Sequence, residues 1–205
     1  MSPEQLLSKY PLISDQVNKD QLSVILRELE KVLAANTNGA IVEFGCYIGT
    51  TSLFIRRLLD AHSDNREFHV YDSFEGLPPK TAQDESRAGD QFQAGELSVS
   101  RKQFLQQFQK AGLRPPITHK SWFSDLTEKD VPEQIAFAFL DGDFYESIRD
   151  SLKLVLPRMQ QGGVIIIDDY AREALPGAAK ATHELLPPQL KATLRTTHNL
   201  GVIDV

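Results

Sequence analysis

The sequence contains one cysteine, no long apolar run and no excess of basic residues, and each absence excludes a class of protein. The single cysteine, Cys46, cannot form an internal disulfide, so nothing points to an oxidising compartment. No apolar run approaches the roughly 18 residues that a membrane-spanning helix needs. The segment from Met1 to Asp20 lacks the basic flank and apolar core of a signal peptide. We therefore expect a cytoplasmic protein with no membrane partner.

The balance of charge excludes a second class. The formal net charge is -6, whereas a protein that holds a phosphate backbone usually carries a basic face, so we expect no nucleic-acid partner. The hydrophobic and charged fractions, 41% and 24%, are those of an ordinary globular protein, and 205 residues suffice for one packed core. We predict a single domain over residues 1–205, in which residues 1–36 form an N-terminal helical segment.

Apolar residues follow two alternating patterns along the chain. Helical spacing predicts helices over 21–35, 50–61, 99–112, 145–159 and 176–186. Short apolar runs predict strands over 40–44, 68–71, 117–120, 135–140 and 164–167, with a hairpin over 192–205. Gly162 and Gly163 are expected to separate the fourth helix from the strand that follows. Strands that alternate with helices indicate an α/β fold, in which helices cover both faces of a parallel sheet.

One segment, residues 75–97, shows neither pattern. Pro, Gly, Gln, Asp and Glu dominate it. A loop this long inside a compact domain is uncommon and is often functional, for example as a lid over a site. A plain unstructured insertion is the alternative, and the sequence favours neither.

Acidic residues end four of the predicted strands: Glu43, Asp72, Asp141 and Asp168. Ligands of parallel α/β sheets bind beyond the carboxyl ends of the strands. The sequence therefore places a site at this edge.

The first strand continues into a turn that contains Gly45 and Gly49, whose conformational freedom lets the backbone approach a ligand. The Gly-x-Gly-x-x-Gly fingerprint and the Walker lysine are absent, which disfavours a pyrophosphate ligand. S-adenosylmethionine (SAM) fits better, because Glu43 can face its positive charge and Asp72 can accept hydrogen bonds from its ribose. The candidate cofactor-binding residues are Glu43, Gly45, Tyr47, Gly49, Thr50, Ser52, Asp72, Ser73, Phe74, Trp122, Phe123 and Asp141. Each aromatic residue among them is also an ordinary core candidate.

Four blocks of the sequence resemble the macrocin O-methyltransferase family. They are Ile41–Gly45, Tyr71–Pro78, Leu140–Ser147 and Ile167–Tyr170, and the resemblance extends from about Ile41 to Leu186. The blocks Asp-Ser-Phe-Glu-Gly-Leu-Pro and Leu-Asp-Gly-Asp-Phe-Tyr-Glu-Ser are far more specific than the glycine turn. The family includes methyltransferases that act on macrolide sugars and other natural-product glycosides.

The resemblance carries implications for fold and activity. It implies a doubly wound, Rossmann-like class I methyltransferase sheet in the order 3-2-1-4-5-7-6, with the last strand antiparallel. It also implies SAM binding, a divalent metal and methylation of a hydroxyl. The expected partner is a small-molecule hydroxyl acceptor, such as a natural-product sugar, and a homodimer is left open.

The family topology makes the strands that end at Asp141 and at Asp168 and Asp169 neighbours, about 4.8 Å apart. Carboxylates this close repel one another unless a cation or protons intervene, and oxygen ligands suit Mg²⁺. We therefore expect Asp141, Asp168 and Asp169 to bind a metal; the alternative is that these acids only form turns. Asp141 and Asp143 are the candidate catalytic residues. The base is left open between them and a metal-bound water.

Two features depart from the family pattern. Ser121 stands where members commonly have glycine, and residues 75–95 contain no histidine to serve as a base. The histidines are all expected away from the site edge: His62, His69, His119, His183 and His198. A nicotinamide-dependent oxidoreductase and a non-catalytic SAM-binding module remain as alternative functions.

Overall fold

The computed structural model describes residues 1–205, and its centre is a seven-stranded sheet in the order β3-β2-β1-β4-β5-β7-β6. Strands β1 to β5 are parallel, and β7 runs antiparallel between β5 and β6. This confirms the predicted fold class and strand order. The strands are β1 (Ala40–Phe44), β2 (Phe68–Asp72), β3 (Ile117–Lys120), β4 (Ile135–Leu140), β5 (Met159–Ile167), β6 (Arg195–Thr197) and β7 (Leu200–Asp204).

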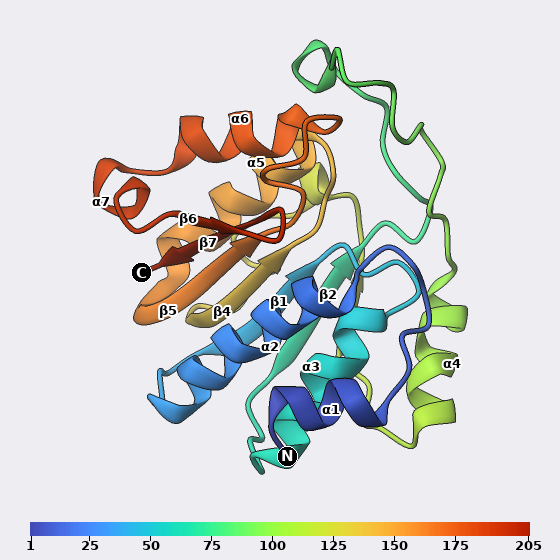
Figure 1. The fold of residues 1–205 in the computed structure, drawn as a ribbon, viewed down its shortest axis with the longest axis vertical. Helices are drawn as coiled ribbons and strands as arrows, with labels where there is room; N and C mark the ends of the chain where they lie inside the picture. The colour runs from blue at the N-terminus through green and yellow to red at the C-terminus, as the bar shows by residue number, and fades with distance from the viewer.

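Helices cover both faces of the sheet, as Figure 1 shows. The first face packs against α1 (Pro3–Lys9), α2 (Lys19–Ala34), α3 (Thr50–Ala61) and α4 (Arg101–Ala111). The second packs against α5 (Tyr145–Val155) and α6 (Pro176–Leu185), and the short α7 (Pro188–Lys191) follows α6. None of these helices combines the length and the apolar character needed to cross a membrane.

The alternation of side chains along β4 explains the two layers. All six residues of β4 are buried. Phe137 and Phe139 point into the core beneath α2 and α3, whereas Ala138 and Leu140 point into the core beneath α5 and α6. Successive side chains of a strand face opposite sides, so a strand buried on both sides reads as one continuous apolar run.

The structure differs from the sequence prediction around Gly162 and Gly163. The helix ends earlier, at Val155, and both glycines lie inside β5. A register shift between β4 and β5 accompanies them, and Gly162 has a φ of +80°. Its N–H donates to Val205 O at 2.7 Å. The glycines therefore form an irregularity in a strand, a role that glycine also has in sheets.

Residues 75–97 contain no strand and no α-helix. Their one regular element is a 3-10 turn, η1 (Ala82–Asp84). Figure 1 shows the segment extending past the ends of the strands to the side of the sheet that carries α6. Two further 3-10 turns, η2 (Phe123–Asp125) and η3 (Leu156–Arg158), lie elsewhere in the chain.

Candidate active site

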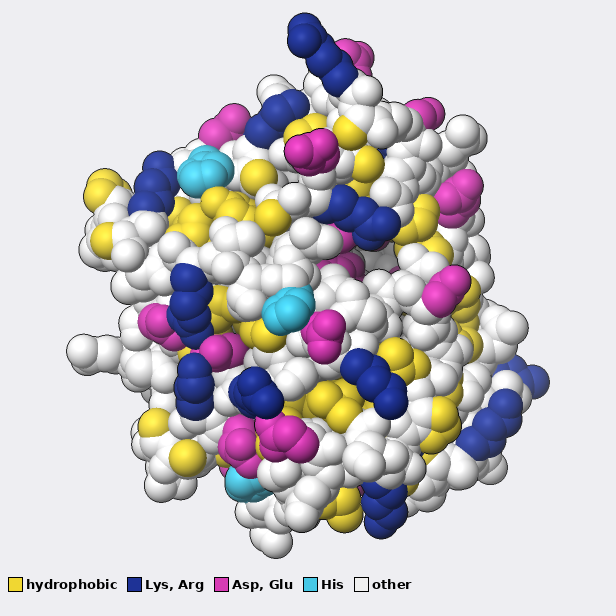
Figure 2. All heavy atoms as spheres, viewed as in Figure 1, with side chains coloured by type: hydrophobic (Ala, Val, Ile, Leu, Met, Phe, Trp, Pro, Cys, Tyr) yellow, Lys and Arg dark blue, Asp and Glu magenta, His cyan; other side chains and the backbone are white.

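A cleft lined by 20 residues opens at the carboxyl ends of β1, β2, β4 and β5. Figure 2 shows it as a hollow with acidic side chains inside. Seven of the twelve candidate cofactor residues line it: Gly45, Tyr47, Asp72, Ser73, Trp122, Phe123 and Asp141. Asp143, Asp168 and Asp169 line it as well, and no histidine does. The cleft thus brings together side chains from four strand ends.

The turn after β1 is tightly constrained. Gly45 has a φ of +86°, and a Cβ there would lie 1.9 Å from Asp141 O. Tyr47 also adopts a left-handed conformation, with a φ of 46°. Gly49 has a φ of +96°, but a Cβ there would meet the Phe104 ring at 2.8 Å, so this glycine packs against α4. Only the first glycine of the motif therefore lines the cleft.

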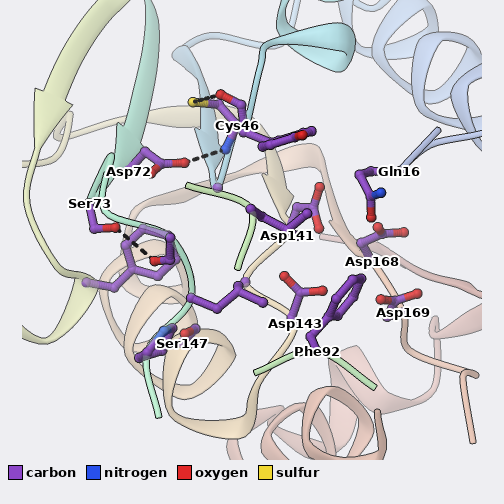
Figure 3. Close-up of a pocket in the computed structure, with 18 of the residues that line it drawn as sticks. Gln16, Cys46, Asp72, Ser73, Phe92, Asp141, Asp143, Ser147, Asp168 and Asp169 are labelled. Atoms are coloured by element: carbon purple, nitrogen blue, oxygen red, sulfur yellow. Dashed lines mark hydrogen bonds between the residues drawn. The ribbon is translucent and has the colours of Figure 1, made fainter. Parts of the chain in front are cut away.

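Asp72 organises two loops at once. Its Oδ2 accepts a hydrogen bond from Cys46 N–H at 2.8 Å, and its Oδ1 accepts one from Phe74 N–H at 2.6 Å. Figure 3 shows the first of these bonds linking the end of β2 to the glycine turn. Each carboxylate oxygen has a second lone pair, so Asp72 can still accept hydrogen bonds from a ligand in the cleft.

Glu43 lies behind the turn and not in the cleft. Its side chain is 1% exposed, Ser52 Oγ donates to its Oε2 at 2.5 Å, and its Oε1 has no partner. Burial is the main reason that the pKa of Glu43 rises to about 8. Thr50, which shares a hydrogen bond with the Ser14 hydroxyl at 2.7 Å, is likewise buried at the start of α3.

The aromatic candidates separate into two groups. Trp122 and Phe123 line the cleft, and the Phe123 ring stands edge-on to Phe44, with their centroids 5.2 Å apart. Phe74 packs instead against Phe104 in the core, at 5.9 Å. Phe74 is therefore a core residue, which is the alternative that the sequence analysis gave for each aromatic candidate.

Three buried aspartates and the half-buried Asp141 gather at one end of the cleft. Figure 3 shows the carboxylates of Asp141, Asp143, Asp168 and Asp169 directed toward a common space. Burial, followed by repulsion from the neighbouring aspartates, raises the pKa of Asp141 and Asp143 well above the ordinary value. The pKa of Asp168 rises to about 7 for the same reasons. For Asp169, burial raises the pKa and the Arg172 guanidinium, 3.1 Å away, opposes the rise.

These acids have few neutralising partners. Arg172 pairs with Asp169, and Gln21 Nε2 donates to Asp168 Oδ1 at 3.3 Å. No three acidic, histidine or cysteine side chains converge closely enough to hold a metal ion. Their oxygen atoms are nevertheless of the chemical type that hard cations bind, and the repulsion between the carboxylates would weaken if a cation lay between them.

The sequence analysis did not predict several of the residues that line the cleft. Gln16 belongs to the stretch between α1 and α2, whereas Phe92 and Leu97 belong to residues 75–97. No local pattern marks these three, because their place depends on tertiary packing. Arg172 is different: it follows Asp169 by three residues in a turn, so an ion pair was foreseeable from the sequence.

The family model described as Macrocin-O-methyltransferase (TylF) matches residues 11–203. The chain belongs to the macrocin O-methyltransferase family. The predicted resemblance is thereby confirmed, and the match begins well before the blocks on which the prediction was based.

Curated relatives agree with the family. The chain is 38% identical over 154 residues to 8-demethyl-8-(2,3-dimethoxy-alpha-L-rhamnosyl)-tetracenomycin-C 4'-O-methyltransferase of Streptomyces olivaceus, covering 71% of this chain and 58% of the relative. It is 31% identical over 158 residues to demethyldecarbamoylnovobiocin O-methyltransferase of Streptomyces niveus, covering 73% and 60%. The chain thus spans less than two thirds of these two relatives.

Solved structures are similar as well. The O-methyltransferase NovP matches with a TM-score of 0.77 and 28% identity, over 89% of this chain and 78% of that one. The calicheamicin methyltransferase CalS11 matches with a TM-score of 0.70 over 98% of this chain and 89% of that one. At 19% identity, the second likeness is one of fold.

Proposed function

We propose that this protein transfers a methyl group from SAM to a hydroxyl of a small molecule, and that the acceptor class is a natural-product sugar. Family membership supports the reaction, and the named acceptors of the curated relatives support the acceptor class. The observation that carries the proposal is the composition of the cleft. A backbone turn and an acid that accepts hydrogen bonds lie at one end, and four aspartates, three of them buried, lie at the other.

The first end suits the nucleoside. The turn at Gly45 would let the backbone approach the ligand, and the free lone pairs of Asp72 would accept hydrogen bonds from the ribose hydroxyls. Trp122 and Phe123 offer aromatic surface for the adenine ring. With the nucleoside held in this way, the sulfonium methyl group would be directed toward the aspartates.

The second part of the proposal is a hard divalent cation such as Mg²⁺ at the acidic end, for which Asp141, Asp168 and Asp169 would draw closer together than they lie in the structure. Buried carboxylates that repel one another give a cation a strong electrostatic advantage. When bound, the cation supplies Lewis acidity, which lowers the pKa of a hydroxyl. The three aspartates would themselves fix the position of the acceptor relative to the methyl group.

The proton of the acceptor hydroxyl must leave as the reaction proceeds. The hydroxyl oxygen forms a bond to the methyl carbon, the carbon–sulfur bond breaks, and the sulfonium becomes a neutral thioether in one displacement. Asp143 is the best-placed proton acceptor, because its buried carboxylate lines the cleft and is not needed as one of the three metal ligands. Residues 75–97 would act as a lid, since Phe92 and Leu97 line the same cleft.

Calorimetry tests the cofactor, and turnover tests the acids. We expect saturable SAM binding below about 1 mM, the upper end of usual KM values. Asp168→Asn should lower turnover of a glycoside acceptor by about 100-fold while SAM still binds, because it removes a ligand for the Lewis acid. The exposed Asp125→Asn serves as the matched control.

The possible results separate the parts of the proposal. Absence of saturable SAM binding would contradict the methyltransferase assignment. If turnover is undiminished in EDTA, the proposed metal requirement is wrong, but the proposed methyl transfer is not contradicted.

A further inference from the structure

Residues 75–97 are fastened to the rest of the molecule by the side chain of Asp84. This residue ends η1 and is 2% exposed, although the segment around it is rich in exposed polar residues. Burial of a charged carboxylate costs free energy unless hydrogen bonds compensate for the lost water. The partners of Asp84 therefore indicate what its burial achieves.

Both carboxylate oxygens of Asp84 accept hydrogen bonds. Oδ2 accepts hydrogen bonds from the N–H and the hydroxyl of Thr81, each at 2.9 Å, which closes the turn. Oδ1 accepts a hydrogen bond from Tyr145 N–H at 2.7 Å, across 61 residues of sequence. The first bonds shape the segment, and the last one joins it to α5.

Tyr145 is the first residue of α5, and this explains the value of the contact. The first amides of a helix have no partner within the helix, and a negative charge at this end interacts favourably with the helix dipole. The N-cap residue of α5 is Phe144, which makes no side-chain cap bond. Asp84 thus supplies from a distant segment the cap that α5 lacks.

Helix α6 leaves room for this carboxylate. A Cβ at Gly177 would lie 2.0 Å from Asp84 Oδ1, so glycine is needed for the approach. Two more hydrogen bonds fasten the segment beside it. Ser86 Oγ donates to Glu173 O at 2.6 Å, and Lys180 Nζ donates to Gln83 O. Several specific contacts therefore join residues 75–97 to α5, to α6 and to the stretch just before α6.

The attachment is linked to the acidic end of the cleft in two ways. Tyr145 lies two residues after Asp143, and Phe92 of the fastened segment lines the cleft. In the view of Figure 3 the Phe92 ring is drawn between Asp143 and Asp169, and all three residues line the same cleft. Movement of the segment would therefore uncover the acids and remove the cap from the helix that follows Asp143.

We propose that Asp84 is a positioning residue, which holds residues 75–97 closed over the acidic end of the cleft by capping α5. This inference rests on the proposed function for its effect on turnover. Its structural part is independent of that function, because closure of the segment can be measured without any acceptor.

Limited proteolysis measures closure directly. Arg87 is exposed within the segment, so trypsin cleavage after it reports how often the segment opens. We expect Asp84→Ala to raise the rate of this cleavage at least about tenfold, because a hydrogen-bonded charged group is lost. The neighbouring Glu85→Ala, at an exposed position, should cleave like the unmodified chain. Equal rates for Asp84→Ala and Glu85→Ala would overturn the proposal.

A second variant removes the donor and leaves Asp84 in place. Tyr145→Pro deletes the N–H, and proline is well tolerated at the first position of a helix. Tyr145→Ala is the control, since it loses the same hydroxyl contact to Glu184 and keeps the N–H. Faster cleavage at Arg87 in the proline variant alone supports the proposal; equal cleavage in both variants contradicts it. This pair stays informative if Asp84→Ala fails to fold.

Turnover separates positioning from mere stabilisation. Asp84→Ala should raise KM for the acceptor several-fold and leave SAM affinity unchanged, because Asp84 does not itself line the cleft that contains the glycine turn and Asp72. A lower melting temperature with unchanged cleavage and unchanged KM would overturn the proposal. If the unmodified chain methylates no acceptor, the proposed function fails, and the cleavage rates still decide whether Asp84 holds the segment closed.

Discussion

Glu43 illustrates how one buried side chain can make stability depend on pH. Burial raises its pKa from 4.5 to about 8. Between these values the unfolded chain ionises while the folded chain keeps the proton. Glu43 therefore lowers the free energy of unfolding progressively as the pH rises from about 4.5 to about 8, and has no such effect at lower pH.

Replacement of Glu43 by Gln should remove this dependence. The variant should gain stability relative to the unmodified chain as the pH rises from 5 to 8, by on the order of 3 kcal/mol. Urea denaturation at several pH values measures the difference, and the exposed Glu133→Gln serves as the control. A constant difference across this range would show that Glu43 is not the titrating group.

At the scale of one element, the turn between β1 and α3 is the most constrained part of the site. A Cβ at Gly45 would meet Asp141 O at 1.9 Å, whereas a Cβ at Gly95 would meet nothing within 4 Å. Their φ values, +86° and +84°, are nearly equal. Alanine substitution at Gly95 therefore measures the cost of backbone strain alone, whereas substitution at Gly45 adds the steric conflict with Asp141.

Gly45→Ala should lower the free energy of unfolding by about 3 kcal/mol or more, because strain and overpacking act together. Gly95→Ala should cost only about 1 kcal/mol, the contribution of the left-handed backbone alone. Denaturant unfolding of both variants checks the prediction. Similar losses at the two positions would mean that β1 and β4 can separate to admit a methyl group.

The elements differ in how far the sequence could predict them. Strands β1, β3 and β4 have the predicted bounds. For β1 and β4 the reason is that a short buried run between turn residues has one obvious interpretation, whereas β3 is a strand with no buried residue at the edge of the sheet. The predicted C-terminal end of α5 was wrong. Gly162 and Gly163 were read as a break between helix and strand, but glycines are also compatible with an irregular strand. The acids at the strand ends were predictable from position alone, whereas Asp84 was not, because its partner lies 61 residues away.

At the scale of the whole molecule, we propose that residues 1–205 form one domain. Residues of α1, α2 and α3 share a single apolar core with β1, β4 and β5. The chain should therefore unfold in one cooperative transition, in which far-ultraviolet circular dichroism and fluorescence coincide. Saturating SAM should stabilise the folded state by about 2.7 kcal/mol at a hundredfold excess over Kd. Two separate transitions would show that the N-terminal helices form a unit of their own.

Trp122 has a further consequence. It is the only tryptophan of the chain, and it lines the cleft. At the long-wavelength edge of the absorption spectrum, light is therefore absorbed by Trp122 alone. The wavelength of its fluorescence emission depends on the polarity around the indole ring. The molecule carries its own optical probe, so occupancy of the cleft can be followed in real time without a label.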